Sequence, residues 1–172
     1  MSDPLHQAKR PVTALAGPYG HPLHPILVTV PIGAWTASLL FDLASHVVDG
    51  PAFLARASLW LVAIGVIGAL AAAMFGFLDF LAIRPGTAAY RTALVHLGLN
   101  LAITAAYGAS WAWRAAGTPD GPVPIGQIIL SVIAMAALGA SGFLGGKLAY
   151  RYGVRVAGES TQAEGFTLQR KG

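Results

Sequence analysis

The segment 57–83, ASLWLVAIGVIGALAAAMFGFLDFLAI, decides the fold class, because its only charged residue is Asp79. A helix needs about 20 mainly apolar residues to cross the hydrocarbon core of a bilayer. Three other segments have this character, and we expect membrane-spanning helices at 25–48, 57–83, 92–114 and 125–150. Over the whole chain 55% of the residues are hydrophobic and only 10% are charged. So few polar groups cannot cover a soluble surface, and the composition predicts an integral membrane protein.

Helix-breaking residues separate the four apolar segments, at 49–51, 84–86 and 117–124. Such short links join antiparallel neighbours, so the sequence predicts an all-α, four-helix up-down bundle embedded in the lipid bilayer. The predicted divisions of the chain are an N-terminal segment at 1–24, a membrane domain at 25–153 and a polar tail at 154–172.

The basic residues predict the orientation of this bundle. In an up-down arrangement only Arg56 and Arg114 fall on the side opposite the termini. The basic residues on the side of the termini are Lys9, Arg10, Arg84, Arg91, Lys147, Arg151, Arg155, Arg170 and Lys171. Cytoplasmic loops of membrane proteins are enriched in Lys and Arg, so we expect both termini to be cytoplasmic. The net charge of +4 is then a sign of topology, and we expect no nucleic-acid partner.

A paired His-Pro motif, GHPLHP at Gly20–Pro25, precedes the first apolar segment. A residue before proline disfavours helical geometry, so the motif predicts a helix that begins at Pro25 with His24 at its N-cap. In a polyproline conformation the rings of His21 and His24 would stand about 9 Å apart. We therefore expect the two histidines not to share one metal ion.

Further polar residues lie at the same membrane face as these histidines. Asp79 lies five residues before Arg84, and His96 lies five residues after Arg91. Helical rise places both about 7 Å deeper than the arginines. Asn100 extends the polar face of His96 by one turn. The sequence predicts one site on the side of the termini, made of His21, His24, Asp79, His96 and Asn100.

Three kinds of site fit these residues. In the first, His96 and either His21 or His24 are the axial iron ligands of a non-covalent haem b. Asp79 would then accept the ring proton of His96. The second is an isolated divalent-metal site on the same histidines, and the third is a hydrogen-bond cluster that holds helix ends together.

In the haem hypothesis, Arg84 and Arg91 pair with the haem propionates at the membrane interface. The chain has no cysteine, which excludes covalent haem and cysteine-ligated iron–sulfur clusters but leaves histidine ligation open.

The other end of the first apolar segment carries Asp42 and His46, four residues apart. This spacing favours a hydrogen-bonded pair or a loop anchor. Along the same segment, Asp42 shares a helical face with Pro31, Trp35 and Ser38, and we expect that face to point into the bundle.

Small residues predict close helix packing on the second helix (Gly68, Ala72, Gly76) and on the fourth (Gly139, Gly142, Gly145, Gly146).

Several motifs together resemble a bacterial membrane-protein family, domain of unknown function 2231. They are GHPLHPILVTVPIGAW at 20–35, FDL at 41–43, GFLDFL at 76–81, His96 with Asn100, and SGFLGGKLAYRYGV at 141–154. The resemblance implies a multi-pass, four-helix domain in the bacterial inner membrane. Some members are joined to a Rieske-type iron–sulfur domain, which implies a separate Rieske-type redox partner here. The chain departs from many relatives at Thr29 and Lys147.

The first function hypothesis is an electron-transfer module that binds haem b, and its electron-transfer part is what the resemblance implies. The alternative is a non-catalytic accessory protein whose His and Asp residues join helix ends. A small ion or proton transporter is the third reading, and four helices would need to form a homo-oligomer to enclose a path. No hydrolase or nucleotide-binding motif is present in the sequence, so we do not expect enzymatic activity.

Overall fold

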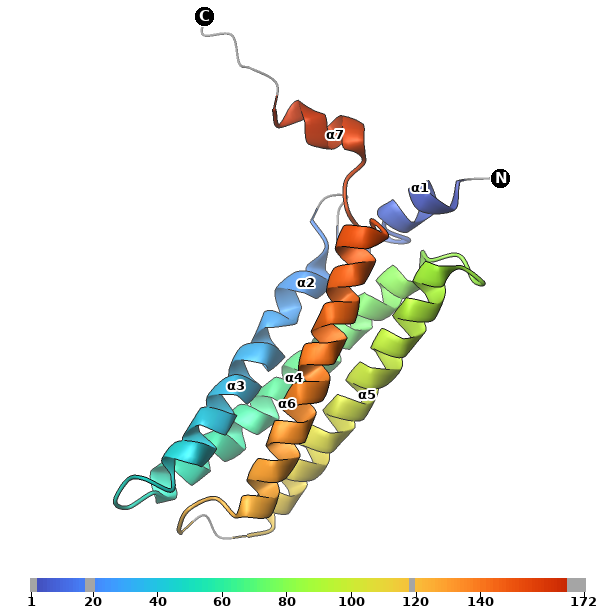
Figure 1. Ribbon diagram of the computed structural model, residues 1–172. Helices are drawn as coiled ribbons and strands as arrows, with labels where there is room; N and C mark the ends of the chain where they lie inside the picture. The colour runs from blue at the N-terminus through green and yellow to red at the C-terminus, as the bar shows by residue number, and fades with distance from the viewer. Residues whose placement is uncertain (1–2, 18–20, 118–119, 167–172) are drawn as a thin grey trace, which may run out of the picture.

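The computed structural model describes residues 3–17, 21–117 and 120–166, and it forms a long bundle of antiparallel helices (Figure 1). Four segments are long and apolar enough to cross a membrane: Leu23–Ala44, Ala52–Leu81, Ala88–Ala115 and Ile125–Arg151. The described ranges contain no strand. The predicted all-α, four-helix membrane bundle is therefore confirmed. Gly20, Arg170 and Lys171, which entered the predictions above, lie outside the described residues.

Two helices make up the first span, α2 (Leu23–Leu27) and α3 (Thr29–Ala44), with a break at Val28. The break has a covalent cause, because Pro31 has no N–H to donate to the carbonyl of Leu27. The predicted start at Pro25 was wrong, since α2 begins at Leu23 and His24 lies inside its first turn. Proline is tolerated in a first turn, where its missing N–H would have no intrahelical partner.

The other three spans are α4 (Ala52–Leu81), α5 (Ala88–Ala115) and α6 (Ile125–Gly146), which continues into a π-helical turn, η2 (Lys147–Arg151). Helices α4 and α5 begin four or five residues earlier than the hydropathy pattern predicted. For α5 the start is fixed by Thr87, whose side-chain oxygen accepts a hydrogen bond from the Tyr90 amide at 3.1 Å.

The four spans form a ring in which α3 packs against α4 and α6, and α5 also packs against α4 and α6. At its centre the rings of Trp35 and Tyr107 stack with centroids 4.0 Å apart. Gly65 lies directly against the Trp35 indole, and Gly68 lies against Val30 and Pro31. The predicted close packing of the second helix through small residues is confirmed.

The outside of the spans is apolar, as contact with lipid requires. Large hydrophobic side chains such as Ile67, Met74, Ile133 and Phe143 are more than half exposed. In a bilayer these side chains contact the acyl chains, so the lipid bilayer is a partner of the protein.

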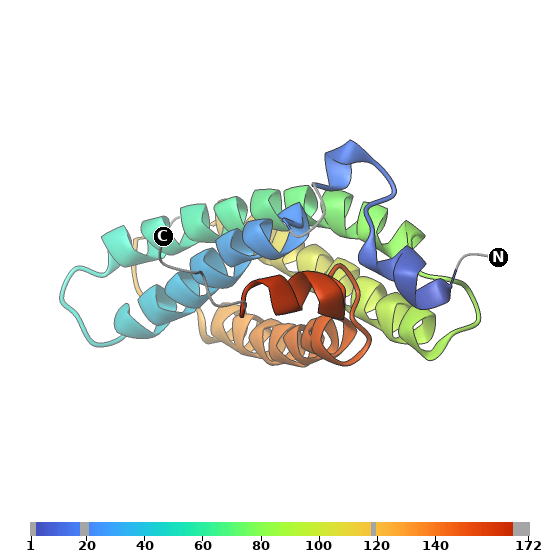
Figure 2. The same ribbon diagram turned by 90° about the horizontal axis from the view of Figure 1, so that it is seen from above.

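Short helices lie at the end of the bundle where both described ends of the chain are found; we call it the termini end. They are α1 (Pro4–Lys9), the 3-10 turn η1 (Ala14–Ala16) and α7 (Glu159–Glu164). Helices α1 and α7 lie beyond the ends of the spans in Figure 1, and Figure 2 shows the same end from above. Ala8 of α1 packs with Ile83, Ala93, Leu148 and Val154. The opposite end, with the α3–α4 and α5–α6 connections, is called the loop end.

Candidate functional site at the termini end

Two histidines from different spans face each other near the termini end. The ring centroids of His24 on α2 and His96 on α5 are 6.4 Å apart, and the ring planes are almost perpendicular at 89°. Both side chains are half-buried. We call these two residues the histidine pair.

A backbone carbonyl of a neighbouring span holds each ring. His24 Nδ1 lies 2.9 Å from the carbonyl oxygen of Ala72 on α4. His96 Nδ1 lies 2.9 Å from the carbonyl oxygen of Ser141 on α6. A carbonyl only accepts hydrogen bonds, so each Nδ1 carries the proton and donates it. Nε2 is then the ring nitrogen that could bind a metal, and Nε2 of His96 also lies 3.3 Å from Asn100 Nδ2.

Glycines make room for both rings. A Cβ atom on Gly76 of α4 would lie 2.8 Å from His24 Nδ1, closer than real side chains approach. A Cβ atom on Gly145 of α6 would lie 3.2 Å from His96 Cε1. The backbones of α4 and α6 can therefore approach the histidine pair only because these two positions lack side chains.

Asn100, one turn after His96, ties the same two spans together. Its Nδ2 donates to the hydroxyl of Ser141 at 2.6 Å and to the His96 carbonyl at 2.8 Å. The Ser141 hydroxyl in turn lies 3.0 Å from His96 Nδ1. Ser141 was not among the residues predicted for this site. The available signal was a hydroxyl in an otherwise apolar helix, where such groups often bond across helices.

Asp79 differs from its predicted role as the acceptor for His96. Its Oδ1 forms an ion pair at 2.8 Å with Nε of Arg155, beyond the last span, and both side chains are about nine-tenths buried. Arg155 also donates from Nη2 to the carbonyl oxygens of Ala16 and Gly17, at 3.0 and 3.1 Å. Asp79 thus joins α4 to both terminal segments, while His96 uses the carbonyl of Ser141.

The remaining predicted site residues are His21, Arg84 and Arg91, and all three are exposed. Within the described ranges, none of them forms a hydrogen bond or ion pair with the histidine pair. Arg84 lies just after α4, and Arg91 lies in the first turn of α5. The structure therefore brings together His24, His96 and Asn100 and leaves these three at the surface of the same end.

A second polar cluster lies inside the bundle near the loop end. Arg114 Nη1 and Nη2 donate to the two carboxylate oxygens of Asp42 at 2.9 and 2.7 Å. Asp42 is fully buried and Arg114 is 6% exposed. Three serines complete the guanidinium and carboxylate hydrogen bonds: Ser58, Ser110 and Ser131. Since its polar groups bond to one another, we assign this cluster to holding α3, α4, α5 and α6 in register.

The predicted Asp42–His46 pair was wrong, because Asp42 pairs with Arg114. Arg114 had been predicted to lie on the side opposite the termini, where it counted only as a sign of orientation. The alternative for His46, a loop anchor, is confirmed, since His46 Nε2 lies 2.9 Å from the carbonyl oxygen of Val123 in the α5–α6 connection.

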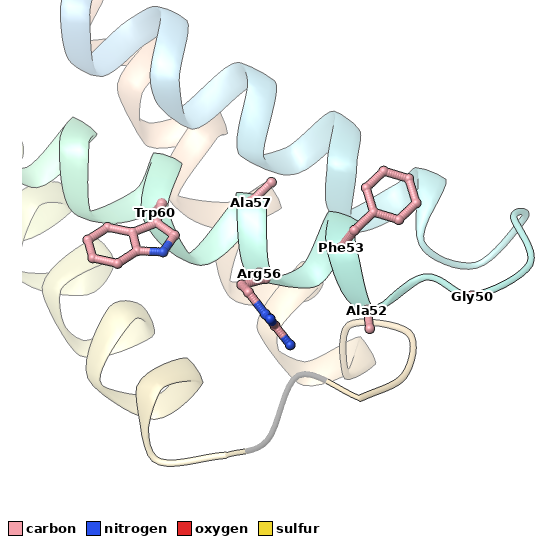
Figure 3. A pocket seen from close by; sticks show the side chains of 6 residues that line it. All are labelled: Gly50, Ala52, Phe53, Arg56, Ala57 and Trp60. Carbon is pink, nitrogen blue, oxygen red and sulfur yellow. The ribbon is translucent and has the colours of Figure 1, made fainter.

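A shallow hollow of about 600 Å³ lies on the outside of α4 at the loop end (Figure 3). Its lining residues are Gly50, Ala52, Phe53, Arg56, Ala57 and Trp60. Trp60 precedes Gly76 by 16 residues, so helical rise puts this hollow about 24 Å from the histidine pair. Its exposed arginine and aromatic side chains are typical of a membrane–water interface.

Residues 20–158 match the family described as predicted membrane protein (DUF2231). The chain belongs to this family. The matched range of DUF2231 contains both polar clusters and all four spans, whereas α1 and α7 lie outside it. No curated protein and no solved structure matches the chain.

Proposed function

We propose that this DUF2231 chain binds haem b between His24 and His96 and acts as a membrane electron-transfer module. The observation that carries the proposal is the separation of 6.4 Å between two rings that are each held through Nδ1. His24 and His96 come from different spans and lie close enough that both could hold the same bound group through their ring nitrogens.

The histidine pair lies between the spans of a membrane bundle. Gly76 and Gly145 leave room there for the two imidazole rings themselves. The helices of a membrane bundle supply the low-polarity environment in which a haem is retained. Haem b bound by two histidines supplies one-electron transfer. In this proposal Arg84 and Arg91, exposed at the same end, pair with the propionates.

The electron would be exchanged with a separate protein, and the resemblance given above favours a Rieske-type partner. The basic surface of the termini end would be the side on which such a partner binds, because the haem ligands lie near that end. His24 and His96 would hold the iron, and Asn100 would keep His96 in place through Ser141.

The test is a visible spectrum of protein purified in detergent from haem-supplemented cells, recorded oxidised and reduced. We expect a Soret band that sharpens and shifts on reduction in the wild-type chain. His24→Ala and His96→Ala should each abolish it. Two matched histidine controls, His21→Ala beside the site and His46→Ala at the loop end, should retain it. Absence of a Soret band from folded wild-type protein would refute the proposal.

A second function is supported by the same hydrogen bonds. His24 links α2 to α4, and His96 links α5 to α6, so the histidine pair also suits a purely structural role in an accessory protein. In that case haem is absent from the wild-type protein, and His96→Ala still lowers its stability. A hydrogen bond of this kind contributes about 0.5–1.5 kcal/mol to the free energy of unfolding.

A further inference from the structure

A second hollow, of about 490 Å³, lies at the termini end between α1 and α7. One wall comes from α1 and the residues after it, and the other comes from the start of α7. Its lining residues are His6, Lys9, Arg10, Pro11, Gly158, Ser160 and Thr161. We call this hollow the basic cavity. It shares no residue with the histidine pair or with the Asp42–Arg114 cluster.

Direct contacts join the two walls. Lys9 Nζ donates to the carbonyl oxygen of Ala157 at 3.3 Å. The Arg155 amide donates to the carbonyl oxygen of Ala8 at 3.0 Å. At the start of α1, the Asp3 side chain accepts a hydrogen bond from the Leu5 amide at 3.0 Å. The cavity is therefore formed by an N-terminal segment that is attached to the residues between η2 and α7.

The side chains around the cavity match a phosphate group in charge and hydrogen bonding. Lys9 and Arg10 supply cationic donors, whereas Nδ1 of the His6 ring lies 3.4 Å from the Asp3 carboxylate. Ser160 and Thr161 supply two neutral hydroxyl donors. No aspartate or glutamate is among its lining residues, so nothing in that set repels an anion.

The position of the cavity brings it to the level of lipid headgroups. It lies directly beyond the last span, whose membrane-length segment ends at Arg151. The N-terminal segment that forms one wall also exposes apolar side chains, with Leu5 48%, Val12 44% and Leu15 72% exposed. Apolar side chains next to basic ones are typical of segments that lie in a membrane interface.

We propose that the basic cavity binds a phosphate group, either in the headgroup of an anionic phospholipid or as a free phosphate ion. Lys9 and Arg10 provide the charge, and the hydroxyls of Ser160 and Thr161 complete the hydrogen bonds. The site is independent of haem and would work equally in a structural or an electron-transfer protein.

The lipid arm of the test uses native mass spectrometry of the full chain, released from nanodiscs of phosphatidylcholine with one-fifth phosphatidylglycerol. The readout is the fraction of protein that keeps one phosphatidylglycerol molecule. A cationic side chain near an anionic membrane contributes about a fivefold change in binding. We expect Arg10→Gln to weaken retention of phosphatidylglycerol about fivefold. Adding Thr161→Val to Arg10→Gln should weaken it further. The matched control is Arg84→Gln, an exposed arginine at the same end but outside the cavity.

The second arm measures binding of inorganic phosphate, by phosphorus NMR line width, to protein in nanodiscs of phosphatidylcholine alone. Retention of lipid without phosphate binding identifies the headgroup as the ligand, and phosphate binding lost in Arg10→Gln identifies the free ion. Failure of both arms overturns the proposal. An equal loss of lipid in Arg84→Gln and Arg10→Gln also overturns it, because the effect would then belong to the general charge of the surface.

Discussion

Removal of the Asp42 charge is the sharpest test of the buried cluster at the loop end. In Asp42→Asn the side chain keeps its shape, but the negative charge is lost and one of the two oxygens that accept from Arg114, at 2.9 and 2.7 Å, becomes an NH2 donor. Arg114 is only 6% exposed, so water does not replace the lost acceptor. Breaking a buried ion pair by removal of one partner costs about 3–5 kcal/mol, because the remaining charge is buried without compensation.

The measurement is the free energy of unfolding in a mild detergent titrated with sodium dodecyl sulfate. We expect Asp42→Asn to lose about 3–5 kcal/mol. The control Asp49→Asn changes an exposed residue of the α3–α4 connection and should change stability by less than about 0.5 kcal/mol. The double variant Asp42→Leu with Arg114→Met removes both charges and should recover most of the loss, because no uncompensated charge remains.

The outcome that refutes this reasoning is specific. If Asp42→Asn is as stable as Asp49→Asn, water reaches Arg114 and the cluster does not hold the bundle. If the double variant is less stable than Asp42→Asn alone, the pair contributes more than it costs to bury, and the desolvation argument is wrong.

Two further predictions concern the termini end. Gly76→Ala should displace His24, because the new Cβ atom meets its ring at 2.8 Å. The measurement is loss of the Soret band, or loss of stability if haem is absent. The control is Gly98→Ala, whose Cβ atom meets no atom within 4 Å. The hydrogen bond from the Leu5 amide lowers the pKa of Asp3 below its ordinary value of 3.8, so this cap stabilises α1 above pH 3.8 and is lost as the pH falls through the lowered pKa. Backbone NMR shifts of α1 should follow this loss in the wild-type chain but not in Asp3→Asn, where a neutral cap remains.

The membrane fold was predictable because it depends on local properties of the sequence. Four apolar segments and the breakers between them determine how many helices are long enough to cross a membrane and make neighbouring helices antiparallel. The start of the first helix was predicted wrongly at Pro25. A residue before proline disfavours helical geometry, but a proline in the first turn of a helix is tolerated. Contacts of His24 with Ala72 and Gly76 stabilise that turn, and they are tertiary.

The site was predictable only in part, for the same reason. Counting residues along helices gives depth, and depth alone placed His24, His96 and Asn100 at the same end. It cannot identify partners across helices, so Asp79 was assigned to His96, although it pairs with Arg155. The glycines of the fourth helix show the same limit. Gly145 packs against His96, whereas a Cβ atom on Gly139 or Gly142 would meet nothing within 4 Å, so their predicted packing within the bundle was wrong.

The buried arginines Arg114 and Arg155 bind partners far away in the sequence, and this has a consequence for biosynthesis. Asp42 enters the membrane with α3, but Arg114 follows 72 residues later, so the carboxylate has no guanidinium partner until the third span is made. Arg155 reaches Ala16 across 139 residues, and the N-terminal segment can close over the bundle only when almost the whole chain has been synthesised. We therefore expect the loop end to assemble first and the termini end last, so that ligands reach the histidine pair before its cover is in place.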